Sequence, residues 1–169
     1  MRKSRVLGAA FVGGLLVGFG MWRGRLRRFE ITEDSMAPAL HAGDYVVASR
    51  LVSTPLRGDV VVFSHPAAPG FLMIKRVIGL PGETVQIDHG QMVANGHVLA
   101  EPWAHGAVAG AHDWQLDGRH LVVLSDNRTV STEDSRELGP LPMGDLWKVE
   151  FRYWPLGRIG RVARSGYGG

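Results

Sequence analysis

Beyond residue 28 the chain is divided into short β-rich runs by turn signals, and this pattern limits the folds that it can adopt. No helical period lasts for ten residues there, apart from one possible turn at Ser35–Leu40. Asn95-Gly96 lies between apolar pairs, which is a strong signal for a β-hairpin, whereas 101–118 has the composition of a loop. The expected strands are 28–32, 44–49, 59–64, 71–80, 84–88, 91–94, 97–99, 121–124 and 146–154. We therefore predict a mainly β fold, a compact antiparallel sheet or partial barrel.

The amino-terminal segment differs from the rest because an apolar run lies between basic residues. Val6–Trp22 contains 17 residues without a charge, and such a run spans about 25 Å as a helix, near the lower limit for crossing a bilayer. No convincing small-x-small cleavage site follows it, which favours an uncleaved anchor over a cleaved signal peptide or a soluble core helix. We expect a membrane anchor over 1–28 with its transmembrane helix at about 6–22, a β-domain over 29–160 and a flexible Gly/Arg tail over 161–169.

The distribution of charge matches this division. Residues 1–28 contain seven bases and no acid, residues 29–151 contain eight bases and all sixteen acids, and residues 152–169 contain four Arg and no acid. The net charge of +3 therefore comes from the two ends of an acidic body, which argues against a nucleic-acid-binding domain. The chain has no Cys, and its seven His lack ligand spacing, so we expect neither a metal site nor a cofactor.

Four segments stand out as candidates for a functional site, namely 34–40, 57–63, 75–83 and 125–136. Each has an ordinary structural explanation when it is taken alone. Ser35 suits a turn or a helix N-cap, Lys75 suits a strand that faces water, and Asp126-Asn127-Arg128 suits a polar turn. Their order and spacing along the chain are more specific than any one of them.

Together the segments resemble the conserved boxes of type I signal peptidases, the Ser–Lys membrane serine proteases of the S26 type. The segment from Ser35 to Leu40 departs from the family's Ser-Met-x-Pro-Thr-Leu only at Ala39, and 75–83 matches the lysine box throughout. Residues 125–128 match the Gly-Asp-Asn-Arg box with Ser in place of Gly, and 131–136 match Ser-x-Asp-Ser-Arg with one residue inserted before Asp134. Residues 153–160 are also similar to the family's carboxyl-terminal ending.

The chemistry of such a site needs a base beside the serine, because a serine hydroxyl is a weak nucleophile. The chain has no Gly-x-Ser-x-Gly elbow and no His with an acid partner at a recognisable spacing, so a Ser-His-Asp triad is unsupported. A lysine can serve if burial keeps it neutral. Lys75 follows the apolar run 71–74, and strand alternation directs Lys75 and Arg76 to opposite faces, so that one can be buried while the other stays solvated.

The resemblance implies a role for each matching residue. Ser35 would be the nucleophile, Lys75 the general base, and Ser131 the hydroxyl that orients the lysine. The backbone N–H of Ser35 would be one oxyanion donor, and the second is unidentified because Glu33 stands where some members have a serine. Residues of a supporting polar network would be Asp126, Arg128, Asp134 and Arg136, and residues of the pockets for small side chains at substrate positions −1 and −3 would be Ile31, Met36, Leu40, Met73 and Ile74.

The function implied by the resemblance is that of a membrane-bound serine endopeptidase, which cleaves signal peptides from translocated precursor proteins. Its partners would be signal peptides and the lipid bilayer, and its single-pass anchor would hold the catalytic domain over 29–160 outside the cytoplasmic membrane. Flanking charges do not set this orientation, and the sequence does not define an oligomeric state. The alternatives are a related protease of the mitochondrial inner membrane, a maturation protease with one dedicated substrate, and a membrane-anchored β-domain that binds peptides or a partner protein without catalysis.

Overall fold

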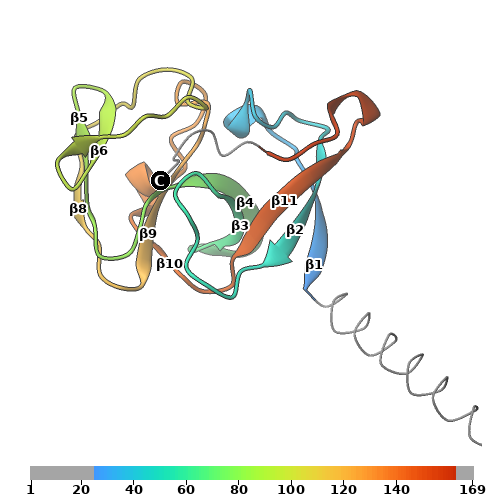
Figure 1. The fold of residues 1–169 in the computed structure, drawn as a ribbon, viewed down its shortest axis with the longest axis horizontal. Coiled ribbons are helices and arrows are strands. Elements are labelled where there is room, and N and C mark those ends of the chain that lie inside the picture. The colour runs from blue at the N-terminus through green and yellow to red at the C-terminus, as the bar shows by residue number, and fades with distance from the viewer. Residues whose placement is uncertain (1–24, 163–169) are drawn as a thin grey trace, which may run out of the picture.

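The computed structural model describes residues 25–162, which are drawn in colour in Figure 1. The predicted anchor helix at 6–22 and the tail beyond residue 162 lie outside these residues. Among the residues described, no helix is both long and apolar enough to cross a membrane.

The described chain forms two antiparallel sheets, which confirms the predicted mainly β fold. The larger, seven-stranded sheet has the order β1-β2-β11-β3-β4-β9-β10, and the smaller, four-stranded sheet has the order β7-β6-β5-β8. The strands are β1 Leu26–Glu30, β2 Tyr45–Arg50, β3 Val60–His65, β4 Ala68–Gly79, β5 Thr84–Asp88, β6 Gln91–Ala94, β7 His97–Val98, β8 Asp113–Gln115, β9 His120–Leu124, β10 Leu141–Pro142 and β11 Trp147–Trp154. The helical elements are η1 Asp34–Met36, α2 Ser135–Leu138 and η2 Leu156–Arg158.

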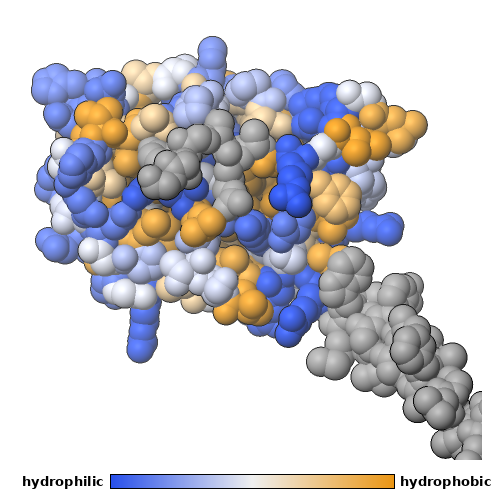
Figure 2. Space-filling view, viewed as in Figure 1, coloured by the Kyte–Doolittle hydropathy of each residue, from blue (hydrophilic) through white to orange (hydrophobic). Residues whose placement is uncertain are grey.

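The two sheets occupy opposite ends of the body. Figure 1 shows β5, β6 and β8 at one end and β1 with β2 at the other, with β4 and β9 between them. On the face seen in Figure 2, polar and charged residues separate small groups of apolar ones. β4 and β9, which are neighbours in the larger sheet, therefore connect the two ends of the body.

Turn chemistry accounts for the hairpin predicted at Asn95-Gly96. Both residues have positive φ, +50° at Asn95 and +79° at Gly96, which is the backbone that a two-residue turn of type I′ requires. The flanking strands β6 and β7 pair through Val93 with Val98 and through Ala94 with His97. The hairpin forms where the sequence predicted it.

The segment 101–118 is not entirely a loop as expected, because it contains the strand β8. This strand has only three residues, and Trp114 is its one buried side chain. It forms by pairing with β5, where Val85 lies opposite Trp114. A strand this short has no alternating pattern of its own, so its existence depends on the partner strand.

Three clusters of buried apolar side chains form the core. One of them packs the segment around η1 against the larger sheet, and its members include Ile31, Met36, Leu40 and Val46. Met36 and Leu40 are 0% exposed, so the residues that follow Ser35 are fixed by the core. Burying two such side chains contributes roughly 1.5 to 3 kcal/mol each to holding this segment in place.

Candidate active site

Ser35 and Lys75 lie side by side although 40 residues separate them in the chain. Ser35 belongs to η1, Lys75 belongs to β4, and Lys75 Nζ donates a hydrogen bond to Ser35 Oγ at 3.3 Å. Both side chains are buried, with residue exposures of 5% for Ser35 and 3% for Lys75. The structure therefore brings together the two residues predicted to carry the chemistry.

Backbone contacts on both sides determine where Ser35 lies. Glu33 is extended, and a single helical turn follows, closed by the N–H of Ala37, which donates to the carbonyl of Asp34 at 3.0 Å. The carbonyl of Ser35 itself accepts a hydrogen bond at 3.0 Å from the N–H of Asn127. The segment 125–128 thus holds the backbone of the serine, while β4 holds the lysine.

Burial governs the protonation of the lysine. Loss of solvent around the amine lowers the pKa of Lys75, because the charged form is disfavoured away from water. The negative charges of Asp134, Glu33 and Glu133 oppose this effect and Arg136 adds to it, but the pKa remains below its ordinary value. The neutral form of this amine is therefore more accessible than that of a lysine in water.

The expectation that either Lys75 or Arg76 stays solvated is wrong, because both side chains on β4 are buried. The side chain of Arg76 is 0% exposed, and it pairs with the carboxylate of Asp126 through Nε at 2.7 Å and Nη2 at 2.6 Å. The guanidinium also lies 4.8 Å from the ring centre of Trp103 and donates to the carbonyl of Gly58 at 2.8 Å. Alternation did separate the two side chains, but both faces of β4 are covered here.

The pKa of Asp126, the buried partner of Arg76, is subject to opposing effects. Burial raises the pKa of Asp126, whereas the hydrogen bond and charge of Arg76, followed by the charge of Arg128, lower it. A bidentate pair with both side chains at 0% exposure still satisfies both carboxylate oxygens. The pair links β4 to the segment that contacts the Ser35 carbonyl.

The other predicted network residues bind the loops around the site. Arg128 Nη2 donates to Glu101 Oε1 at 2.6 Å, and its Nε donates to the carbonyl of Ser125. Asp134 caps α2 by accepting from the N–H of Arg136 at 3.1 Å, and its other oxygen accepts from the N–H of Ser125 at 2.9 Å. These contacts connect the end of β9 with α2 despite the residue inserted before Asp134.

Ser131 is half-buried on the same loop, and its position does not show the predicted contact with the lysine. Within residues 25–162, the recorded side-chain hydrogen bond of Lys75 Nζ goes to Ser35. The carbonyl of Ser131 accepts from Arg136 Nη2, and the neighbouring Thr132 donates its hydroxyl to Glu137. The orienting role of Ser131 stays a prediction.

A cleft of about 290 Å³ opens beside Ser35 and Lys75. Three of the predicted pocket residues, Ile31, Met73 and Ile74, line it, whereas Met36 and Leu40 are not on its wall and pack in the core. Sequence reasoning did not identify the other lining residues, which are Arg28, Phe29, Glu30, Thr32, Glu33, Val62, Phe71, Leu72 and Glu133. The available sequence signal was their position beside the motif residues, since 28–33 precede Ser35 directly and 71–72 belong to the apolar run before Lys75.

Two strand edges border this cleft. β1 is the outermost strand of the larger sheet and pairs only with β2 there. β4 pairs with β3 over residues 72–76, but its pairing with β9 begins at Arg76, so residues 71–75 have an unpaired edge. Unpaired edges accept an extended peptide as an added strand.

No group of three or more His, Asp or Glu side chains in the described part of the chain is arranged to hold a metal ion. Within the cleft, the site offers the Lys75 amine, the Ser35 hydroxyl and the backbone N–H of Ser35. Such a set suits attack on a carbonyl carbon.

Comparisons with known proteins agree with this geometry. The family model described as signal peptidase, peptidase S26, matches residues 4–154. A signal peptidase I from Leptolyngbya laminosa is 34% identical over 149 residues, which cover 78% of this chain and 70% of that protein. A probable signal peptidase I-2 from Synechocystis is 31% identical over 166 residues, which cover 91% of this chain and 75% of that protein. The crystal structure of a signal peptidase I from Enterococcus faecalis matches with a TM-score of 0.51 and 26% identity, covering 59% of this chain and 98% of that one.

Proposed function

This chain belongs to the signal peptidase family, peptidase S26, and on that basis we propose that it cleaves signal peptides from precursor proteins with Ser35 and Lys75 as its catalytic dyad. The observation that carries the proposal is the 3.3 Å contact between Ser35 Oγ and the amine of a lysine that is 3% exposed. The dyad accounts for a nucleophile and a base without any further group.

In the first half of the reaction, neutral Lys75 accepts the Ser35 hydroxyl proton as Oγ attacks the scissile carbonyl carbon. The N–H of Ser35 donates to the oxygen of the tetrahedral intermediate. The ammonium of Lys75 then gives its proton to the departing amine, and an acyl ester on Ser35 remains. In the second half, Lys75 accepts a proton from water, the resulting hydroxide attacks the ester, and the proton returns to Oγ.

The charges around Lys75 suit a group that gains and loses a proton in each cycle. Burial favours the neutral amine that starts the reaction. The charges of Asp134, Glu33 and Glu133 stabilise the ammonium once it forms and oppose the lowering of the pKa by burial. A base with a pKa near the working pH is the most effective one.

The substrate would bind as an extended strand between the edges of β1 and β4. Ile31, Met73 and Ile74 would form shallow apolar pockets for small side chains at positions −1 and −3. The larger sheet would act as the partial barrel that holds Lys75 opposite the serine. A peptide bound as this added strand would have its scissile bond at the end of the cleft that contains Ser35.

We also propose that residues 1–28 anchor the catalytic domain to the cytoplasmic membrane, with residues 29–160 outside the cytoplasm. β1 begins at Leu26, four residues after the apolar run ends at Trp22, and residues 28–33 line the cleft. Four extended residues span at most about 14 Å. The cleft would thus lie close to the bilayer surface, where an emerging signal peptide is presented.

The proposal is tested by incubating the purified full-length chain in detergent with a precursor that has Ala at positions −1 and −3. We expect one cut, after position −1, identified by amino-terminal sequencing of the product. Replacing either Ala with Trp should block the cut, because a shallow pocket cannot hold the larger side chain. Cleavage at unrelated positions, or equal cleavage of the Trp substrates, would contradict the proposal. Depletion of the protein in cells would then show whether many precursors accumulate or only one.

The pH dependence of the reaction follows from the lowered pKa of Lys75. The reactive form is the neutral amine, so kcat/KM should fall as the pH drops through that pKa and should rise to a plateau above it. The Glu33→Gln substitution removes a charge that raises the pKa of Lys75, so it should move the acidic limb of the profile to lower pH. Glu150→Gln, on the exposed face of β11, is the matched control and should leave the profile in place. An acidic limb that stays fixed in the Glu33 variant would show that this limb does not report Lys75.

A further inference from the structure

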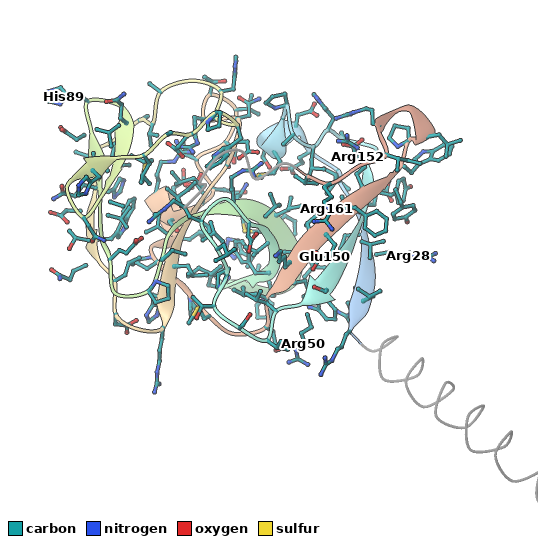
Figure 3. The ribbon with its side chains drawn as sticks, viewed as in Figure 1. Arg28, Arg50, His89, Glu150, Arg152 and Arg161 are labelled. Atoms are coloured by element: carbon teal, nitrogen blue, oxygen red, sulfur yellow. The ribbon has the colours of Figure 1, made fainter. Side chains whose placement is uncertain are left out.

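The carboxyl-terminal end of β11 lies beside the segment that carries Ser35. Arg152 lies two residues before the end of this strand, and its backbone exchanges two hydrogen bonds with Gly160, at 2.8 and 3.1 Å. Its side chain points away from the strand, and Arg152 Nη1 donates to the carbonyl of Ala39 at 2.9 Å. Figure 3 labels Arg152 beside the segment that follows η1. The contact joins residues that are 113 positions apart in the chain.

The side chain of Arg152 also contacts the carboxylate of Asp44. Asp44 is 1% exposed, and its carboxylate lies between two guanidinium groups, 3.3 Å from Arg152 Nη1 and 3.2 Å from Arg158 Nη1. One of its oxygens also accepts from the N–H of His41 at 2.9 Å. A carboxylate buried with two cations and a backbone donor is satisfied and rigid. We call Arg152, Arg158, Asp44 and the carbonyl of Ala39 the carboxyl-terminal clamp.

The clamp is connected to Ser35 through the loop that it holds. The N–H of Ala42 donates to Asp34 Oδ1 at 3.0 Å, so the loop between Ala39 and Asp44 is attached to the residue before the nucleophile. The N–H of Leu40 donates to the carbonyl of Met36 at 2.9 Å, which attaches it to the residue after the nucleophile. These two hydrogen bonds couple the position of this loop to that of η1.

The other end of the clamp is fixed to the sheet that carries the base. β3 pairs with β4, which holds Lys75, and also with β11, which holds Arg152. Lys75 and Arg152 thus belong to one hydrogen-bonded sheet, whereas Ser35 belongs to η1. The clamp is one of the contacts that join this segment to the sheet, beside the buried Met36 and Leu40 and the hydrogen bond from the N–H of Asn127 to the Ser35 carbonyl.

We propose that Arg152 is a positioning residue for the proposed reaction, which holds the Ser35 segment at the distance from Lys75 that proton transfer requires. The inference rests on the proposed Ser35–Lys75 dyad. It also means that residues 152–160 act on the active site indirectly, since none of them lines the cleft. Because the clamp does not touch the cleft, its loss should slow the chemical step and leave substrate binding unchanged.

The test compares variants of the full-length chain in detergent, with a peptide substrate that has Ala at −1 and −3. For Arg152→Met, which keeps the length of the side chain but cannot donate, we expect kcat to fall by about 10- to 100-fold with KM within about twofold of wild type. Arg152→Lys can still reach one acceptor, so it should recover part of the lost kcat. Arg50→Met removes an exposed arginine of the neighbouring strand β2 and should change neither constant.

Circular dichroism and thermal unfolding must show that each variant is folded at the assay temperature. If Arg152→Met does not fold, Arg152→Lys replaces it, since it keeps the charge but reaches only one acceptor; it should lower kcat at least about threefold with an unchanged KM. A folded variant that retains wild-type kcat, or that loses activity only through KM, would overturn the inference. These outcomes are separate from a failure of the dyad, which would appear as an active Ser35→Ala enzyme.

Discussion

Replacing Ser35 with Ala should lower kcat/KM toward a signal-peptide substrate by a factor on the order of 10⁴ to 10⁶. The Oγ atom is the group that forms the acyl ester, and in the structure it is the hydroxyl that contacts the buried amine of Lys75. The substitution removes a single buried oxygen, so the variant should remain folded and should still bind the peptide. The loss is measured from the rate at which the product with the new amino terminus appears.

Ser49→Ala is the matched control for that experiment. Ser49 lies on β2, donates its hydroxyl to Glu150 and is not among the residues that line the cleft. Its loss should leave kcat/KM within about twofold of wild type, as is usual for surface substitutions. If Ser35→Ala retains more than a small percentage of wild-type activity, then Ser35 is not the nucleophile.

Replacing Lys75 with Met should lower kcat/KM by about 10³- to 10⁴-fold, because methionine has a similar length but cannot accept a proton. Lys75→Arg should be equally inactive, since a guanidinium does not lose its proton in proteins. Lys148→Met, on β11, is the lysine control; because Lys148 pairs with the buried carboxylate of Asp59 at 3.4 Å, its folding is checked by thermal unfolding, and the folded variant should keep wild-type activity. Activity in Lys75→Arg would show that position 75 supplies a positive charge rather than a base.

The Lys75→Met variant should also be at least as stable as wild type at neutral pH. Because burial lowers the pKa of Lys75 in the folded state, the unfolded chain binds the proton more strongly, and stability is reduced at every pH below the unfolded pKa. Methionine removes this cost, and the difference from wild type should disappear as the pH rises above the unfolded pKa. Thermal unfolding at several pH values measures it and separates loss of catalysis from loss of folding.

Local sequence signals predicted the parts of the fold that depend on local physics. The hairpin at Asn95-Gly96 formed because its turn needs two residues with positive φ, and Asn followed by Gly meets that need. β8 escaped prediction because its three residues take their structure from β5. The burial of Arg76 also escaped, since strand alternation describes two faces but does not show that Trp103 and Asp126 cover the second one.

The candidate site depends on contacts between distant parts of the chain. No periodicity places Ser35 within 3.3 Å of Lys75, and only the order of four motifs indicated that the two act together. The clamp gave no comparable signal, because Arg152 and Asp44 lie 108 residues apart and neither belongs to those motifs. The clamp forms because the carboxyl-terminal end of β11 lies beside the loop that follows η1.

The neutral state of Lys75 is the central claim, and it can be measured directly on the lysine side chains. The chain contains three lysines, Lys3, Lys75 and Lys148, so isotope-labelled lysine should give three side-chain nitrogen signals in a nuclear magnetic resonance titration. The signal that disappears in Lys75→Met belongs to Lys75. We predict that this signal titrates well below the other two, and that its midpoint matches the acidic limb of the pH profile of kcat/KM. Three signals that titrate together at the ordinary lysine pKa would contradict the mechanism.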